Sequence, residues 1–202
     1  MTTSAPRGQL IAFEGLDQSG KQTQAEQLAA VLRGAGRRVE CLSFPEYDTA
    51  IGAEIGRALQ GERDYAPDTM QLLYIANRYE FRPRILDWLA AGVIVVCDRY
   101  LASSVAYGEA QGLDPAWLLD VQKFLPQPGL TLLLDIPPDA SLVRKQAARD
   151  KFERDLPLLS RVRESYRRQA AESNWVLVEG ERGRDAVGAA VVMAVRSRLG
   201  LL

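Results

Sequence analysis

The 202-residue sequence contains no histidine. This absence excludes Ser-His-Asp catalysis, acid–base chemistry by imidazole and zinc sites built on histidine. Only two cysteines occur, Cys41 and Cys97, and each lies in an apolar run that predicts a buried strand. We expect both to be reduced core residues rather than a disulfide or metal ligands. Any chemistry must therefore use carboxylates, arginine, lysine, backbone amides and, where one binds, Mg²⁺.

The chain also lacks an excess of charge of either sign and a long apolar run. Its net charge is −1, from 25 basic and 26 acidic residues, whereas a protein that coats a nucleic acid needs a basic excess. No run approaches the roughly 18 apolar residues of a membrane span, and the N-terminal MTTSAPRGQL does not resemble a signal peptide. We expect a cytoplasmic protein that binds neither nucleic acid nor membrane. A small anionic ligand stays compatible, because a few arginines can hold one.

Short apolar runs alternate with segments of helical periodicity along the whole chain. Strands are predicted at 9–15, 37–44, 92–100, 130–137 and 174–180. Helices are predicted at 21–33, 50–60, 68–91 after a cap-like Asp68, 101–125 with a break near Gly112–Pro115, 138–172 with an interruption near 149–155, and 184–199. The alternation predicts one α/β domain over residues 1–202, with a loose tail at 1–8 and a five-stranded parallel sheet covered by helices on both faces.

In such sheets, ligands bind beyond the carboxyl ends of the strands. The segment after the first predicted strand, within AFEGLDQSGKQTQ (12–24), nearly matches the phosphate-binding pattern G-x-x-x-x-G-K-[ST]. Gly15, Gly20 and Lys21 fit this pattern, but Gln22 replaces the hydroxyl residue, which follows at Thr23. Glycines let backbone N–H groups converge, and the helix start and the lysine add positive charge. The segment predicts a phosphate-binding loop (P-loop), with a glycine turn and a solvated lysine as the alternative.

A second candidate site follows the third predicted strand, which ends at Asp98. P-loop proteins carry a carboxylate at this place that reaches the Mg²⁺ shell, although a helix N-cap would use the same residue type. Arg99 comes next and can hold a phosphate with its planar fork. The pair supports a nucleotide site at this edge of the sheet.

Six segments together resemble the thymidylate kinase family, from about residue 9 to about residue 180. They are FEGLDQSGKQTQ, FPEYDTAIG, LLYIANRYEFRPRI, VIVVCDRYLASSVAYGEAQG, LPQPGLTLLLDIPP and RDKFERD. The resemblance implies a P-loop nucleoside monophosphate kinase that transfers the γ-phosphoryl group of ATP to dTMP with Mg²⁺, and that forms a homodimer.

The resemblance also implies roles for individual residues. The implied catalytic residues are Asp17, Lys21, Arg99 and Arg149. The implied ATP site comprises Gly15, Leu16, Asp17, Gln18, Ser19, Gly20, Lys21, Gln22, Thr23 and Arg144, and the implied metal ligands are Asp98 and Gln22. The implied dTMP site comprises Asp17, Phe44, Pro45, Tyr47, Tyr74, Arg78, Arg99, Ser103, Ser104 and Tyr107. Residues 143–155 look like the family's lid over ATP, and Arg149 and then Arg144 are its preferred cations.

Two parts of the acceptor site have plainer interpretations. Tyr74 and Arg78 form an i,i+4 pair that could simply cover a helix face. Ser103 and Ser104 could cap a helix start.

The chain departs from the family pattern at five positions, which are Gln18, Gln22, Glu46, Gly108 and Lys151, where the family usually has an arginine. Gln22 affects the metal shell, and Gln18 stands where one branch has an arginine. Glu46 and Gly108 weaken the inference of pyrimidine specificity more than that of phosphoryl transfer. Another nucleotide or deoxynucleoside kinase therefore stays open as an alternative. So does a P-loop protein that binds nucleotide without turnover.

Overall fold

The computed structural model describes residues 8–144 and 155–202. The strands are β1 (Leu10–Glu14), β2 (Val39–Ser43), β3 (Ile94–Asp98), β4 (Leu130–Asp135) and β5 (Trp175–Glu179). The helices are α1 (Lys21–Gly34), α2 (Ala50–Leu59), α3 (Pro67–Ala90), α4 (Leu101–Ala110), α5 (Pro115–Val121), α6 (Pro138–Arg144), α7 (Leu156–Gln169) and α8 (Arg184–Leu199). The strands form one parallel sheet in the order β2-β3-β1-β4-β5. The predicted fold class is confirmed.

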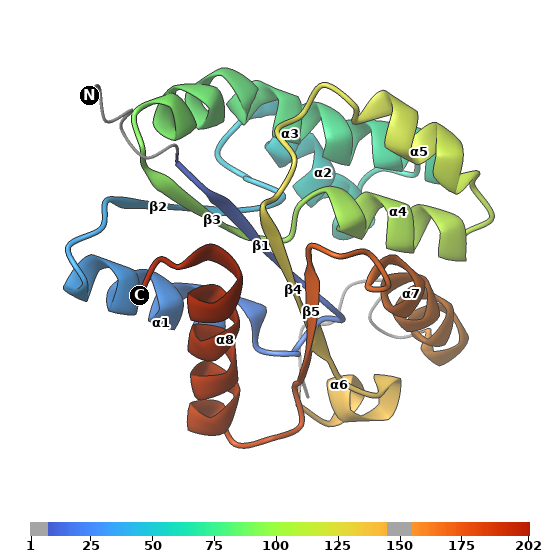
Figure 1. Ribbon diagram of the computed structural model, residues 1–202. Helices are drawn as coiled ribbons and strands as arrows, with labels where there is room; N and C mark the ends of the chain where they lie inside the picture. The colour runs from blue at the N-terminus through green and yellow to red at the C-terminus, as the bar shows by residue number, and fades with distance from the viewer. Residues whose placement is uncertain (1–7, 145–154) are drawn as a thin grey trace.

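Two helical layers enclose the sheet (Figure 1). Ile11 and Phe13 pack toward α1 and α8, whereas Leu10 and Ala12 face the layer that contains α3. The layer opposite α1 and α8 also contains α4 and α7, which pack together through a cluster around Ala106. Successive side chains of a strand point to opposite faces, so apolar runs such as LIAFE produce a strand buried on both sides.

The strand order places the ligand edge between β1 and β3. The chain leaves β1 and returns on one side as β3 and on the other side as β4, so β1 lies where the winding direction changes. Phe13 pairs with Asp98, and Asp98 also pairs with Ser43. The loops after β1, β2 and β3 therefore open at the same edge, which is where ligands bind in open parallel sheets.

Two local predictions were wrong. Cys41 is exposed, because β2 is an edge strand and only its Val39 and Leu42 side chains are buried. Cys97 lies in the interior strand β3 and is buried as expected, and burial raises the pKa of its thiol. Asp68 does not cap α3, because the helix begins with Pro67 and Asp68 lies inside its first turn. A proline fits the first helical position, where its missing N–H is not needed.

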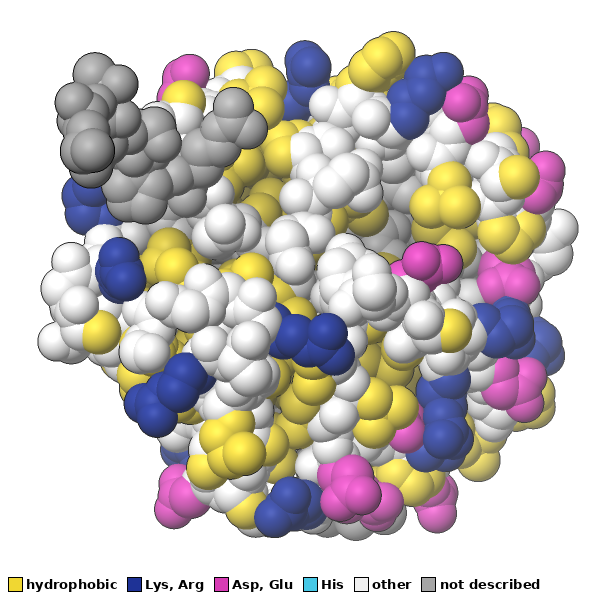
Figure 2. All heavy atoms as spheres, in the orientation of Figure 1, with side chains coloured by type: hydrophobic (Ala, Val, Ile, Leu, Met, Phe, Trp, Pro, Cys, Tyr) yellow, Lys and Arg dark blue, Asp and Glu magenta, His cyan; other side chains and the backbone are white. Residues whose placement is uncertain are grey.

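Two further predictions concern residues outside the described part of the chain. The loose tail at 1–8 falls almost entirely on residues 1–7, and the lid at 143–155 falls mostly on 145–154. Within 8–144 and 155–202, no helix is long and apolar enough to span a membrane. On the face in Figure 2, acidic and basic side chains are interspersed, and neither sign dominates.

Candidate active site

The segment between β1 and α1 forms a tight loop around exposed helix amides. Gly15 has φ 138°, and a Cβ there would lie 2.5 Å from the Leu134 carbonyl oxygen, so only glycine fits. Gln18 and Gly20 also have positive φ values, of 61° and 95°. Gly20 precedes α1 and provides no side-chain cap. The first N–H groups of α1 therefore remain available to an anion.

Lys21 begins α1 and is almost fully buried. Its Nζ donates a hydrogen bond to the Leu16 carbonyl oxygen at 2.8 Å. Burial lowers the Lys21 pKa to about 8, and Arg99 adds to this effect while Asp17 opposes it. The carboxylates of Asp17, Asp98 and Glu14 favour the charged lysine, but the effect of burial is larger.

Four polar residues around the loop differ in burial and in hydrogen bonding. Gln22 is exposed, and its amide nitrogen donates to Glu26 Oε1 at 3.0 Å, so its role as a metal ligand stays a prediction. Thr23 is partly buried in the first turn of α1. Ser19 Oγ is buried, and so is Asp98 Oδ1 at the end of β3, and neither atom has a hydrogen-bond partner. Oxygen atoms of this kind are the ligands that Mg²⁺ prefers, so the site fits that ion.

Arg99 connects the two predicted phosphate sites. Its backbone has φ 62°, which is uncommon outside glycine. Its Nη2 pairs with Asp17 Oδ1, and its Nη1 donates to the Gly15 carbonyl oxygen at 3.3 Å and to Tyr166 Oη at 3.3 Å. The guanidinium therefore lies directly against the P-loop.

Charge pairing dominates the ionisation of this centre. Burial alone would raise the Asp17 pKa, but Arg99 and Lys21 lower it to about 2. Burial would lower the Arg99 pKa, but Asp17 raises it well above its usual value. Tyr107 donates to Asp17 Oδ2 at 3.1 Å, and burial together with the Asp17 charge raises its pKa well above the usual value. At neutral pH the centre therefore contains a carboxylate, a guanidinium and a protonated phenol.

Glu14 is a site residue that the sequence reasoning missed. It is the last residue of β1 and is completely buried. Its Oε1 accepts from the N–H groups of Tyr100 at 2.9 Å and Ser103 at 3.3 Å. Its Oε2 accepts from Ser103 Oγ at 2.6 Å and Tyr166 Oη at 3.1 Å. An acidic residue ending an apolar strand was the only signal in the sequence, and its partners are more than 80 positions away.

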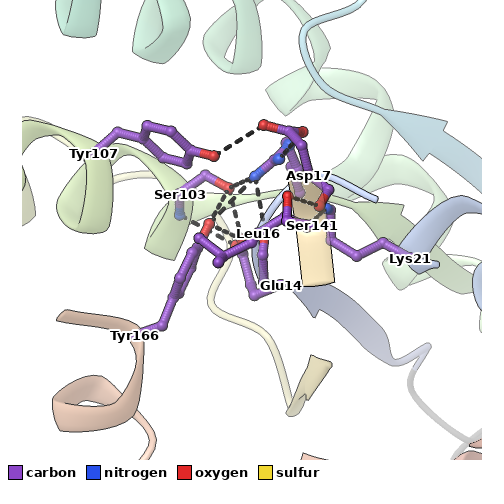
Figure 3. A network of polar contacts seen from close by, with 10 residues as sticks. Glu14, Leu16, Asp17, Lys21, Ser103, Tyr107, Ser141 and Tyr166 are labelled. Atoms are coloured by element: carbon purple, nitrogen blue, oxygen red, sulfur yellow. Dashed lines mark hydrogen bonds and ion pairs between the residues drawn. The ribbon is translucent and has the colours of Figure 1, made fainter. Parts of the chain in front are cut away.

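Glu14 joins the first turn of α4 to α7. Ser103 and Tyr166, which bind its carboxylate, are also partners of the Arg99 guanidinium. In Figure 3 their side chains approach Glu14 from two different helices, and the Tyr107 hydroxyl points to Asp17. We infer that Glu14 holds α4 and α7 in the arrangement that orients Arg99.

Replacing Glu14 by glutamine is expected to lower the free energy of unfolding by about 2 kcal/mol, because an amide N–H₂ would then face N–H and O–H donors in the interior. Urea unfolding measures this change. Glu172→Gln on the exposed surface is a control expected to change stability by less than about 0.5 kcal/mol. Equal stability of the Glu14 variant and wild type would contradict the network.

A pocket lies beside this centre, and its empty space, part of which is open to solvent, is about 620 Å³. It is called the acceptor pocket because it contains the residues predicted for the dTMP site. Its lining includes every predicted dTMP-site residue, together with three that were not predicted. The predicted ones are Asp17, Phe44, Pro45, Tyr47, Tyr74, Arg78, Arg99, Ser103, Ser104 and Tyr107, and the others are Leu59, Gln71 and Gln111.

Arg78 lies deep in this pocket rather than on a helix surface. It is almost fully buried, its Nη1 donates to Ser104 Oγ at 2.7 Å, and its Nε has no partner. No ion pair joins it to another described residue, and burial lowers its pKa. The Ser104 hydroxyl thus accepts a hydrogen bond from Arg78, and the Ser103 hydroxyl donates one to Glu14. Neither side chain acts as a plain helix cap.

Asn77 is a second residue that the sequence reasoning passed over. Its Oδ1 accepts from the Glu46 N–H at 2.8 Å, and its Nδ2 donates to the Glu46 carbonyl oxygen at 3.1 Å. This side chain binds the loop that follows β2, where Phe44 and Pro45 are joined by a cis peptide bond. Asn77 thereby holds one wall of the acceptor pocket against α3.

Only part of the predicted lid is described. Arg144 is the last residue of α6, and the structure does not describe its side chain. Arg149, Lys145 and Lys151 lie outside the described residues. Nearby, Ser141 Oγ donates to the Asp17 carbonyl oxygen at 2.7 Å, which ties α6 to the P-loop.

Comparison with known proteins identifies the family of the chain. The family model for thymidylate kinase matches residues 13–191. The thymidylate kinase of Plasmodium falciparum is 34% identical over 90% of this chain and 87% of its own length, and that of Homo sapiens is 33% identical over 91% and 88%. A solved thymidylate kinase structure from Candida albicans has a TM-score of 0.84 and 26% identity, and the match covers 98% of this chain and 96% of that one. The chain belongs to the thymidylate kinase family.

Proposed function

We propose that this kinase transfers the γ-phosphoryl group of ATP to the 5′-phosphate of dTMP, and that Arg99 and the P-loop bring the two nucleotides end to end. The hydrogen bond from Arg99 Nη1 to the Gly15 carbonyl oxygen at 3.3 Å carries this proposal. It means that an anion held by Arg99 lies next to an anion held by the loop. Phosphoryl transfer needs mainly this positioning and the neutralisation of charge.

The reaction needs no general base. An oxygen of the acceptor phosphate attacks the γ-phosphorus, the bond to the β–γ bridging oxygen breaks, and ADP leaves. A phosphate dianion has no proton to lose, which agrees with a site that contains no histidine. Lys21 and the α1 amides would hold the donor phosphates, and Arg99 would hold the acceptor phosphate through its planar fork.

Asp17 would act on Arg99 rather than on the phosphates. Its carboxylate pairs with Arg99 Nη2 and accepts from Tyr107. A negative charge repels phosphate, so its benefit lies in fixing the guanidinium and the phenol. The Tyr107 ring, 5.5 Å from Arg99 Cζ, would then form the wall beside the acceptor sugar. The remaining negative charge would be met by Arg149, and secondarily by Arg144.

Mg²⁺ would be held near Asp98, whose buried Oδ1 has no other partner, with Gln22 as the second proposed ligand. When bound, the ion neutralises charge on the donor phosphates. Asp98 ends β3 directly before Arg99, so the same strand end provides the acidic and the basic group.

Replacing Gln22 by serine is expected to retain activity and to change the Mg²⁺ concentration that gives half-maximal rate, because a hydroxyl would stand where the amide now bonds to Glu26. Titration of the rate with Mg²⁺ at saturating nucleotides measures this shift. A folded variant without activity would contradict the proposed metal shell.

The pH dependence of kcat/KM for ATP should follow the ionisation of Lys21. Because its pKa is about 8 in the free protein, kcat/KM for ATP should fall about tenfold per pH unit well above pH 8. The kcat profile should extend to higher pH, since bound phosphates favour the charged lysine. Direct measurement of ADP by chromatography avoids coupling enzymes. A kcat/KM that stays level up to about pH 10 would contradict the assignment.

A panel of acceptors tests the function itself. ADP release is measured with dTMP, dUMP, dGMP, AMP and thymidine, with and without Mg²⁺. The expected order places dTMP first, with no activity on thymidine because Arg99 then has no phosphate to hold. Equal or better activity on a purine nucleotide would overturn the proposed substrate.

We also infer a homodimer that uses the outer surface of α3 and α5. Four large apolar side chains are exposed there or just after α5, which are Leu72, Leu86, Leu119 and Phe124. Sedimentation velocity at micromolar concentration should give twice the mass of one chain. The cytoplasmic location stays a prediction from the sequence.

A further inference from the structure

Gln71 lies in the wall of the acceptor pocket and has no described partner. It belongs to α3, one turn before Tyr74 and two turns before Arg78, so the three residues share a helix face. The residue is 2% exposed, and its Oε1 is buried without a hydrogen bond. Buried amides are normally satisfied, because a missing hydrogen bond destabilises the fold. An unsatisfied amide beside a ligand pocket therefore points to a ligand that completes it.

Gly108 allows Gln71 to occupy this position. A Cβ on residue 108 would lie 3.3 Å from Gln71 Cγ and 2.6 Å from Leu118 Cδ1. The Gln71 stem and Leu118 therefore pack directly over the Gly108 backbone. The departure from the family pattern at Gly108 thus has a structural counterpart, since the space above α4 is filled from α3 and α5.

Arg78 defines the chemistry of the same wall. It carries a buried positive charge with a free Nε donor, whereas Gln71 offers a free oxygen acceptor. A donor and an acceptor that line the same pocket are chemically complementary to a base edge with a carbonyl oxygen next to a ring N–H. Thymine and uracil have this edge at C4 and N3. Cytosine has the reverse order, because it presents an amino group and an unprotonated ring nitrogen.

We propose that Gln71 is a specificity-determining residue that accepts a hydrogen bond from the ring N–H of the acceptor base, beside Arg78. This inference rests on the proposed function and names the part of the acceptor that one further residue recognises. Gln71 selects bases with an imide edge and disfavours those with an amino group at that position.

The test compares Gln71→Met with a matched control. Methionine keeps the length of the side chain and removes its hydrogen bonds. Gln122 is the control, because it is also 2% exposed with an unpartnered Oε1 but does not line the acceptor pocket. For each protein, kcat/KM is measured with dTMP and dCMP, the KM for ATP is determined, and dTMP binding is followed by calorimetry without ATP.

Gln71→Met should lower kcat/KM for dTMP by about 10- to 100-fold and weaken dTMP binding by a similar factor, while the KM for ATP changes less than about twofold. The dTMP to dCMP ratio should fall by about the same factor, and Gln122→Met should retain the wild-type ratio. An unchanged ratio in Gln71→Met would overturn the proposal, whatever happens to the absolute rate.

A probe on the wild-type protein keeps the proposal testable if the variant does not fold. N3-methyl-dTMP lacks the ring N–H, and we expect it to lose at least about tenfold in kcat/KM relative to dTMP. Equal use of the two nucleotides would exclude an N–H contact to Gln71. Suppose that wild type uses dTMP, that Gln71→Met keeps the wild-type dTMP to dCMP ratio, and that N3-methyl-dTMP is used as well as dTMP. In that case only this inference fails. If wild type neither uses nor binds dTMP, the proposed function fails with it.

Discussion

Replacing Arg99 by alanine is expected to raise the KM for dTMP by roughly 100- to 1,000-fold, while the KM for ATP changes less than about threefold. A guanidinium that holds a phosphate makes two charge-assisted hydrogen bonds, each contributing about 1.5–3 kcal/mol. The partners of Arg99 show why the loss should be specific to the acceptor. It pairs with Asp17, and both residues line the acceptor pocket. Steady-state kinetics with each nucleotide varied in turn measures both constants.

Two further variants separate charge from geometry at this position. Arg99→Lys keeps the charge but loses the fork, so its effect should be intermediate. Arg198→Ala removes an exposed arginine of α8 and should leave both KM values unchanged. An unchanged KM for dTMP in Arg99→Ala would show that another group binds the acceptor phosphate.

Replacing Lys21 by methionine is expected to lower kcat at least about 100-fold with little change in dTMP binding. The positive charge lies at the start of α1, where the donor phosphates would gain charge as the transfer proceeds, and losing one such preorganised donor typically reduces kcat 10²- to 10³-fold. Single-turnover measurement of dTDP formation reports the chemical step directly. Lys123→Met, which changes an exposed lysine, is the matched control.

The same substitution should not destabilise the protein. The fall in the Lys21 pKa from 10.5 to about 8 corresponds to roughly 3 kcal/mol against the charged form in the folded state. Between these pH values the unfolded chain keeps the proton that the folded chain has lost. The free energy of unfolding should therefore rise with pH across this window in wild type, and rise less in Lys21→Met. The free energy of unfolding of each protein is measured by urea unfolding from pH 7 to about pH 10. The same pH dependence in both proteins would contradict a buried Lys21 with a lowered pKa.

Local patterns were sufficient for the elements and for the phosphate-binding half of the site. Apolar runs of five or six residues marked the strands, and the order of motifs placed Lys21, Asp98 and Arg99 at one edge of the sheet. These features depend on residues close together in the chain. Burial of Cys41 was mispredicted for the opposite reason, because the strand order decides which strand is at the edge.

Side chains that act across the fold could not be recognised in this way. Glu14 binds α4 and α7 through partners 86 to 152 positions away, and Asn77 holds a loop 31 positions before it. The position of Gln71 depends on the glycine at position 108, over which Gln71 and Leu118 pack. In the sequence each of these looks like an ordinary strand-end or helix residue.

The sequence by itself determined the α/β class, the phosphate-binding loop and the family resemblance, because spacing within a short segment sets hydrophobic periodicity and loop geometry. Only the tertiary structure decided which buried polar groups satisfy one another and which are left for a ligand. That question depends on hydrogen bonds between residues brought together by folding. A buried acceptor has a partner or lacks one according to what the neighbouring helices place beside it.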